Sequence, residues 1–149
     1  DDLYRRICGA RLQPVLDMIR LHHELGVWIE ITTLVIPGYN DDADQLKQIA
    51  GFIAGIDTDI PWHISAFYPT YKLTDAVPTP LSALEKARTL GLEAGLKHVY
   101  LGNVNDQSDT RCPKCRALLI KRAGFGVISN RISGGQCPVC AANIKGVWT

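Results

Sequence analysis

Four cysteines have a spacing that suits a metal ion. Cys112 and Cys115 form one Cys-Pro-x-Cys pair, Cys137 and Cys140 form a second, and 21 residues separate the pairs. Two thiolates from one tight turn reach the same ion, and two such turns complete a tetrahedron of sulfur ligands. With every position filled by sulfur, we expect a structural zinc site with no place for a substrate. Iron in a rubredoxin-like site would use the same ligands.

Redox chemistry is the alternative for these cysteines. A thioredoxin-like dithiol would need only one pair, placed between a strand and a helix. Here the pairs flank a predicted hairpin of residues 118–122 and 127–131, and residues 144–148 are predicted to add a third strand. We therefore predict a β-rich zinc ribbon over residues 105–149. A segment of this size has too small a core to fold alone, so bound metal would stabilise it.

The preceding residues alternate between helical and strand patterns. Apolar residues recur with helical spacing over residues 12–19 and 46–53, and a third helix is predicted over residues 80–94. We expect Asp42 to cap the second helix and Thr79 to cap the third, because both residue types accept hydrogen bonds from the first helical N–H groups.

Three strands are predicted at residues 27–36, 62–68 and 98–104, and they begin 35 and 36 residues apart. This period is typical of repeated β–α units, whose strands lie parallel. Three strands cannot close a barrel, and an open three-stranded sheet would leave an apolar edge exposed. We therefore interpret residues 1–104 as the second half of a partial (β/α) barrel, with the preceding strands missing from this chain.

Composition and charge limit the class of protein. The chain has 149 residues, of which 46% are hydrophobic and 21% charged, as in ordinary globular proteins. Residues 1–109 carry a net charge of −6, whereas residues 110–149 carry +7 with no acidic residue. No apolar run approaches the roughly 18 residues of a membrane span, and no signal peptide opens the chain. We expect a cytoplasmic protein, and a first residue other than Met suggests a fragment.

Motifs spread over the whole chain carry a family resemblance. They include Thr-Thr-Leu-Val-Ile-Pro-Gly-Tyr-Asn-Asp at residues 32–41 and Pro-Trp-His-Ile-Ser at residues 61–65. Further matching segments are residues 7–12, 26–28, 71–72, 78–80, 93–96 and 102–104. These motifs resemble radical SAM enzymes related to pyruvate formate-lyase activating enzyme. The cysteine pairs and Gly-Val-Trp at residues 146–148 narrow the resemblance to the AmmeMemoRadiSam-system branch, named for its association with the Memo and Ammecr families. Arg116 and Ala141 depart from the glycine that usually follows each knuckle's second cysteine.

The resemblance implies an activity for a longer protein. Members of the family use a [4Fe-4S] cluster to cleave S-adenosylmethionine reductively, and the resulting 5′-deoxyadenosyl radical abstracts hydrogen from a substrate. Their C-x₃-C-x₂-C cluster loop is not present here, because Cys8 has no cysteine at those spacings. The chain is therefore expected to be inactive without the missing N-terminal half of the barrel. A protein substrate, or a partner of the Memo or Ammecr type, is implied as well.

Several residues are candidates for the cofactor or substrate. The resemblance places Val35 and Ile36 near the adenine of the cofactor, and His63 near its methionine or ribose part. A core histidine bonded to a backbone carbonyl is the alternative for His63. Glu30 and Thr32 lie on one side of their predicted strand, where both can face a barrel lumen. A salt bridge at the bottom rim is the alternative for Glu30.

Four more substrate candidates follow predicted strands. Tyr68, Tyr71 and Lys72 lie just beyond a C-terminal strand end, where barrel enzymes place substrate loops, and Asn103 ends the third strand. The family often has histidine in place of Tyr68, so an acid–base role is not carried over to this tyrosine.

A binding module is the alternative function. The positive charge of the C-terminal segment suits nucleic acid or an acidic protein. It comes from Arg111, Lys114, Arg116, Lys121, Arg122, Arg131 and Lys145. Only Phe125 and Trp148 are candidates for base stacking, so we do not expect nucleic acid as a partner. We instead expect the basic segment to face the acidic part of the same chain.

Overall fold

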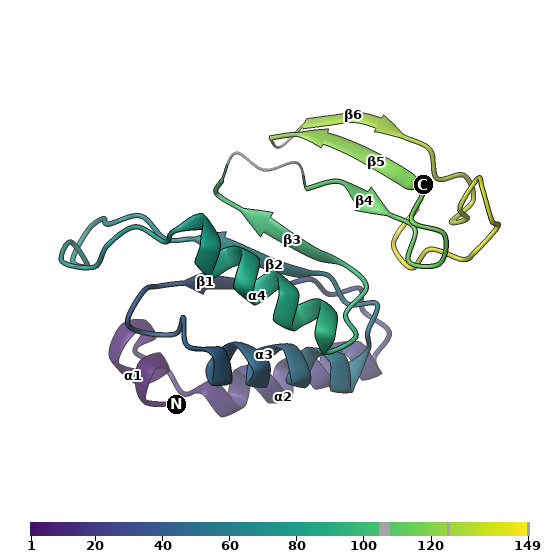
Figure 1. Ribbon diagram of the computed structural model, residues 1–149. Coiled ribbons are helices and arrows are strands. Elements are labelled where there is room, and N and C mark those ends of the chain that lie inside the picture. Colours follow the sequence, from purple (N-terminus) through teal and green to yellow (C-terminus); the bar gives the residue numbers. More distant parts are fainter. Residues whose placement is uncertain (105–107, 125, 149) are drawn as a thin grey trace.

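Three parallel strands organise the first part of the computed structural model, which describes residues 1–104, 108–124 and 126–148 (Figure 1). They are β1 (Ile31–Val35), β2 (Trp62–Ala66) and β3 (Val99–Gly102), in the order β1-β2-β3. Their register pairs Thr32 with His63, and His63 with Tyr100. The predicted parallel sheet is confirmed, although each strand is shorter than predicted. Residues 105–107, at the predicted domain boundary, and Phe125 lie outside the described residues.

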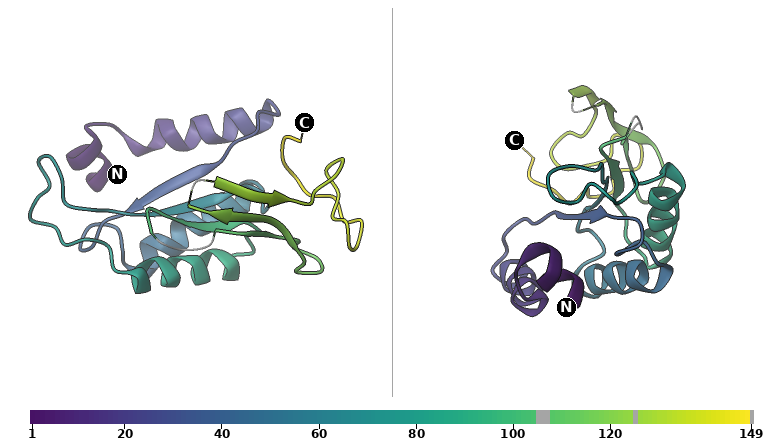
Figure 2. Two further views of the ribbon diagram at one scale, coloured as in Figure 1. Left: turned by 90° about the horizontal axis from the view of Figure 1, so that it is seen from above. Right: turned by 90° about the vertical axis from the view of Figure 1, so that its left-hand side faces the viewer.

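The helices lie along one side of this sheet, as Figures 1 and 2 show. They are α1 (Asp2–Cys8), α2 (Leu12–Glu24), α3 (Ala43–Ile56) and α4 (Leu81–Glu93). The prediction for Asp42 is confirmed, because its side chain accepts hydrogen bonds from the backbone N–H groups of Asp44 and Gln45. None of the helices in the described residues is long and apolar enough to cross a membrane.

The prediction that Thr79 caps α4 is wrong. Pro80 occupies the cap position, with no side-chain hydrogen bond to the helix. The buried Thr79 hydroxyl instead accepts a hydrogen bond from the Phe67 N–H at 2.8 Å and donates one to the Val35 carbonyl at 2.5 Å. The Thr79 side chain therefore links the C-terminal ends of β1 and β2. It is held there because the buried Phe67 N–H and Val35 carbonyl both need a hydrogen-bond partner.

Side chains alternate across the sheet, so its two faces differ. Trp62, Ile64 and Ala66 point toward the helices and are fully buried, together with Leu46 and Ile53 of α3. The opposite side, here called the open face, is less buried. The open face consists of Thr32, Leu34, His63, Ser65 and Tyr100.

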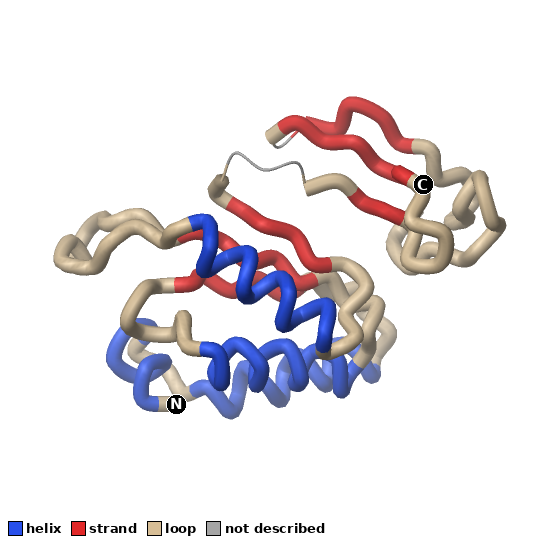
Figure 3. The backbone as a smooth tube through the Cα atoms, viewed as in Figure 1, coloured by secondary structure: helices blue, strands red, loops and turns tan. Residues whose placement is uncertain are grey.

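Three antiparallel strands form the second sheet, in the order β4-β5-β6 (Figure 3). They are β4 (Thr110–Arg111), β5 (Leu118–Ala123) and β6 (Gly126–Asn130). The predicted hairpin is confirmed, but the prediction of a third strand at residues 144–148 is wrong, since β4 takes that role. The Trp148 indole N–H donates to the Ile144 carbonyl at 2.7 Å, and Gly146 between them has a φ of 155°. The segment therefore folds back on itself.

The second sheet and its cysteine loops, here called the four-cysteine module (residues 108–124 and 126–148), lie over the open face, opposite the helices (Figures 1 and 2). Tyr100 of β3 shares a hydrogen bond of 2.8 Å with the Thr110 hydroxyl of β4. The Arg122 guanidinium of β5 lies 5.5 Å from the centre of the Tyr100 ring. Tyr100 thus connects the parallel sheet to the module.

Candidate metal centre and the adjoining cavity

Two similar backbone loops position the four cysteines. The Arg116 N–H donates to the Cys112 carbonyl, and the Ala141 N–H donates to the Cys137 carbonyl, each at 2.9 Å. Arg116 and Ala141 have left-handed φ values of 63° and 55°. This conformation costs a non-glycine residue roughly 1–2 kcal/mol. The expected strain therefore falls on the two residues that replace glycine.

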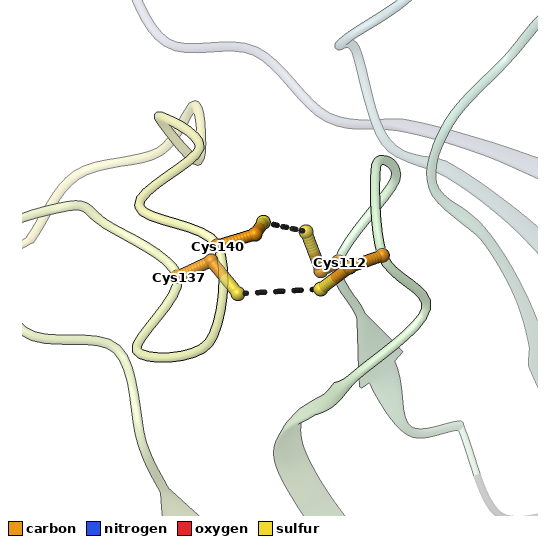
Figure 4. Close-up of side chains that lie close together, drawn as sticks. Cys112, Cys137 and Cys140 are labelled. Atoms are coloured by element: carbon orange, nitrogen blue, oxygen red, sulfur yellow. Dashed lines mark hydrogen bonds between the residues drawn. The ribbon is translucent and has the colours of Figure 1, made fainter.

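The four sulfurs form a compact cluster (Figure 4). All of them lie within 4.8 Å of one another, and the Cys112–Cys140 and Cys115–Cys137 sulfur distances are both 3.7 Å. A tetrahedral zinc ion with bonds of about 2.3 Å requires sulfurs about 3.8 Å apart. The two printed distances match this requirement, and the cluster as a whole is compact enough to hold a tetrahedral metal such as zinc.

The pKa values of the clustered cysteines are shifted in opposite directions, because the four thiols affect one another. Desolvation opposes ionisation of Cys137, but the N–H groups of Val139 and Cys140 and the nearby thiols lower its pKa to about 6. The Ala117 N–H favours the Cys115 thiolate, yet desolvation and the other three thiols raise its pKa to about 12. Four thiolates therefore repel one another in this cluster, and a divalent cation would remove that repulsion.

The core of the four-cysteine module is small. Besides Cys112 and Cys137, the buried residues of its hydrophobic cluster are Leu119, Ile120 and Ile144. This limited apolar core offers little stabilisation in the absence of a ligand. A bound metal would therefore stabilise the module more than it would stabilise the first sheet.

A hydrogen-bonded pair lies at the N-terminal ends of the parallel strands. His63 Nε2 is 2.6 Å from Glu30 Oε2, and the Trp28 indole N–H donates to Glu30 Oε1 at 3.1 Å. The His63 ring stacks on Tyr100, with 5.3 Å between ring centres. Thr32 lies beside His63 on the open face. Sequence reasoning treated Glu30 and His63 separately and missed Trp28 and Tyr100, because the register between strands was unknown.

Val35 and Ile36 lie at the other end of β1. Both side chains are buried; the Val35 carbonyl accepts from Thr79, and the Ile36 N–H donates to the Asn40 side chain at 2.6 Å. His63 is in register with Thr32, three residues before Val35, or roughly 10 Å along the strand. The structure does not bring His63 together with Val35 and Ile36.

The four remaining substrate candidates form two separate pairs. The Tyr68 hydroxyl donates to the Asn103 carbonyl at 3.0 Å, and the Asn103 amide donates to the Ala66 carbonyl at 3.2 Å. Tyr71 is 83% exposed, and the Lys72 ammonium lies 5.3 Å from the centre of its ring. Only Tyr68 and Asn103 are thus held at the C-terminal edge of the sheet.

A cavity of about 610 Å³ lies between the parallel sheet and the four-cysteine module. Glu30, His63 and Tyr100 line it from the sheet, and Arg122 and Lys145 line it from the module. Sequence reasoning used Arg122 and Lys145 only as contributors to a positive charge. Their place at one cavity depends on the packing of two parts that are distant in the sequence.

The chain is similar to one longer archaeal protein. No model of a known protein family matches the chain. The uncharacterized protein MJ0808 of Methanocaldococcus jannaschii is 43% identical to it over 148 residues, which cover 96% of this chain and 44% of the relative. The chain therefore spans less than half of the length of this relative. Because nearly all of the chain is matched, the similarity includes both the parallel sheet and the four-cysteine module.

Proposed function

We propose that this chain is the C-terminal part of a radical SAM enzyme, in which the parallel sheet is the second half of a partial (β/α) barrel and the module is a zinc ribbon. One observation carries the proposal. The sheet is parallel, and the described helices lie on one side of it, as in a segment of barrel wall. A doubly wound sheet would have helices on both sides.

The edge of the sheet at β1 supports the proposal of a preceding barrel strand that would pair with it. Within the described residues β1 pairs only with β2, and its Leu34 is 43% exposed on the open face. An apolar groove separates α2 from the start of β1, and no residue of α2 is fully buried. The groove is lined in part by Val15, Met18, Ile19, Ile29 and Ile31. A preceding strand and helix of the barrel would cover this groove and pair with β1.

The length of the archaeal relative is compatible with such a neighbour, since this chain spans 44% of it. The four-cysteine module uses its thiols for a separate metal site, and Cys8 is exposed and distant from them in sequence. In this proposal the four thiols hold zinc, and they are not assigned to the cluster. The [4Fe-4S] cluster would be held by the preceding part of the protein, and with S-adenosylmethionine it would supply the radical.

In the complete enzyme, this chain would contribute residues that contact the substrate. Tyr68 and Asn103 hold each other at the C-terminal edge of the sheet, where barrel enzymes bind their substrates. The exposed Tyr71 and Lys72 extend beyond that edge and suit contact with a protein substrate or a Memo- or Ammecr-type partner. Because the backbone groups of Val35 and Ile36 are already bonded, these residues would shape the neighbouring loop rather than bond to adenine.

The test is to translate the DNA upstream of Asp1 and express the complete reading frame without oxygen. We expect a C-x₃-C-x₂-C motif, a reconstituted iron–sulfur absorbance, and 5′-deoxyadenosine on addition of S-adenosylmethionine and dithionite. Replacing one cysteine of that motif by alanine should abolish the product, and residues 1–149 alone should give none. A reading frame without the motif, or a complete protein that forms no 5′-deoxyadenosine, would contradict the proposal.

A second function, binding of an acidic partner by the module, is favoured by its exposed charge. Six of its seven basic side chains are exposed, and only Arg122 is partly buried. No ion pair in the described part of the chain joins the module to an acidic residue of the first part. The Lys145 charge does help to lower the pKa of Asp57, after the larger effects of the Asp59 N–H and of His23. Retention on a polyanion column at low salt, lost at modest salt, would support this function, and no retention would contradict it.

A further inference from the structure

The cavity between the open face and the four-cysteine module has the properties of a small-molecule site. Its volume of about 610 Å³ is within the range of roughly 300–1,000 Å³ that is typical of ligand pockets. Its walls come from both parts of the protein, so the cavity exists only when the module is docked on the sheet. Apolar and aromatic surface alternates there with a few charged groups.

The module side of the cavity is positively charged. One nitrogen of the Arg122 guanidinium donates to the Ser108 carbonyl and the Thr110 hydroxyl, each at 2.8 Å. Both acceptors are neutral. Neither Arg122 nor Lys145 forms an ion pair with a carboxylate in residues 1–104, 108–124 and 126–148. Two cations therefore line one cavity with side chains that can bind an anion, while the Asp109 carboxylate accepts from the backbone N–H of Arg122 at 2.9 Å and the Lys145 charge also acts on Asp57.

The sheet side of the cavity offsets this charge only in part. Glu30 is the only acidic residue among the described lining residues. One of its oxygens faces His63 Nε2 at 2.6 Å, and the other accepts from the Trp28 indole at 3.1 Å. Its single negative charge is outweighed by the two positive charges of Arg122 and Lys145, so these three charged lining residues leave the cavity net positive.

Aromatic rings give the cavity flat walls. Trp28 and Tyr100 line it from the first part of the chain, and Trp148 lines it from the module. The Tyr100 ring is fixed by its stacking on His63, its hydrogen bond to Thr110 and the guanidinium of Arg122. Fixed aromatic surfaces next to cations suit a planar ring that carries a negative charge.

We propose that this cavity binds a small planar organic anion. Arg122 and Lys145 bind its carboxylate or phosphate group, and its ring packs against the aromatic walls. The site does not depend on the radical chemistry proposed above. It uses only residues of this chain, so it is testable without a cluster and without S-adenosylmethionine.

The test uses the full 149-residue chain loaded with zinc and two matched pairs of probes. AMP is compared with adenosine, and benzoate with benzamide, by isothermal titration calorimetry. We expect at least one anion to bind about tenfold more tightly than its neutral partner. The AMP and benzoate arms distinguish a phosphate from a carboxylate ligand. If neither anion binds more tightly than its neutral partner, the proposal is overturned.

Two lysine variants locate the site. Lys145→Met removes a cation from the cavity wall and should weaken binding of the anion by about tenfold. Lys114→Met removes the same charge from an exposed position of the module outside the cavity lining, and it should leave binding within about twofold of the original. Far-UV circular dichroism and bound zinc verify that both variants are folded. Unchanged binding in Lys145→Met, or equal losses in both variants, would overturn the assignment.

Discussion

Gly91 of α4 lies directly against the ring of Trp62 in β2. A methyl group on Gly91 would be 2.8 Å from Cε3 of Trp62 and 3.2 Å from a methyl carbon of Val99. Trp62 is fully buried, and its indole N–H donates to the Thr33 hydroxyl at 2.9 Å. The ring therefore cannot move aside without losing this hydrogen bond, and the close approach of α4 to the sheet requires glycine.

Gly91→Ala should destabilise the protein, although alanine favours a helix. The gain in helix propensity is about 1 kcal/mol, whereas forcing a methyl group into a packed core typically costs about 1–3 kcal/mol. We expect a net loss of about 1 kcal/mol in the free energy of unfolding, measured by urea denaturation.

Gly51→Ala in α3 is the matched control for this change. No heavy atom lies within 4 Å of a methyl group at Gly51, and the residue is exposed. Only the propensity gain remains, so this variant should be more stable by up to about 1 kcal/mol. If both variants gain stability equally, α4 does not pack on Trp62 as described.

These glycines show which features the sequence could predict. The cap at Asp42 and the hairpin near Gly124 depend on residues a few positions apart, and the structure confirms both. The sequence indicated that Gly91 weakens its helix, but it could not identify Trp62, which is 29 residues away, as the reason. The four cysteines were predictable as a set because two local turns of the same kind define their ligand geometry.

The remaining site residues could not be predicted because they depend on long-range packing. His63 and Glu30 are 33 residues apart, and they meet only because β1 and β2 pair in one particular register. Thr79 has the residue type of a helix cap, yet its hydroxyl satisfies buried backbone groups from two strands instead. Buried polar groups elsewhere in the fold overrode the local preference.

Thr79→Val should destabilise the protein because it removes that hydroxyl while keeping the shape of the side chain. The Phe67 N–H and the Val35 carbonyl would lose a buried partner, which costs about 1–3 kcal/mol. Urea denaturation of the variant measures this loss. Thr89→Val is the control, since the exposed Thr89 hydroxyl bonds to the Glu85 carbonyl within α4. Equal effects at both positions would contradict the bridging role of Thr79.

Cys137→Ser should release the metal and unfold the four-cysteine module. Cys137 is buried and one of four clustered ligands, and a serine hydroxyl binds zinc far more weakly than a thiolate. We expect about one equivalent of zinc in the original protein and almost none in the variant, by elemental analysis. Amide NMR signals of the module should collapse while those of α3 and β2 persist.

Cys8→Ser provides the matched control for the metal. Cys8 is exposed at the end of α1 and does not belong to the cluster. Its replacement removes one thiol but no ligand, so zinc content and the spectrum of the module should not change. Full occupancy in Cys137→Ser, or equal metal loss in both variants, would exclude a four-thiolate site.

His98 should make the protein less stable in mild acid. Burial lowers the pKa of His98 below its ordinary value of 6.5, and the charge of Asp59 opposes this effect only in part. Above pH 6.5 the residue is neutral in both the folded and the unfolded chain, so it contributes no pH dependence. Below that pH the unfolded chain takes up the proton first, and stability falls until the pH passes the folded pKa.

His98→Gln isolates the contribution of His98. Acid also protonates the cysteine ligands and weakens metal binding, but this effect is the same in the original protein and in the variant. The advantage of the original protein in unfolding free energy over His98→Gln should shrink as the pH falls from about 7.5 to about 5.5. Urea denaturation at several pH values measures the difference. An advantage that stays constant or grows in acid would show that burial does not hold His98 neutral.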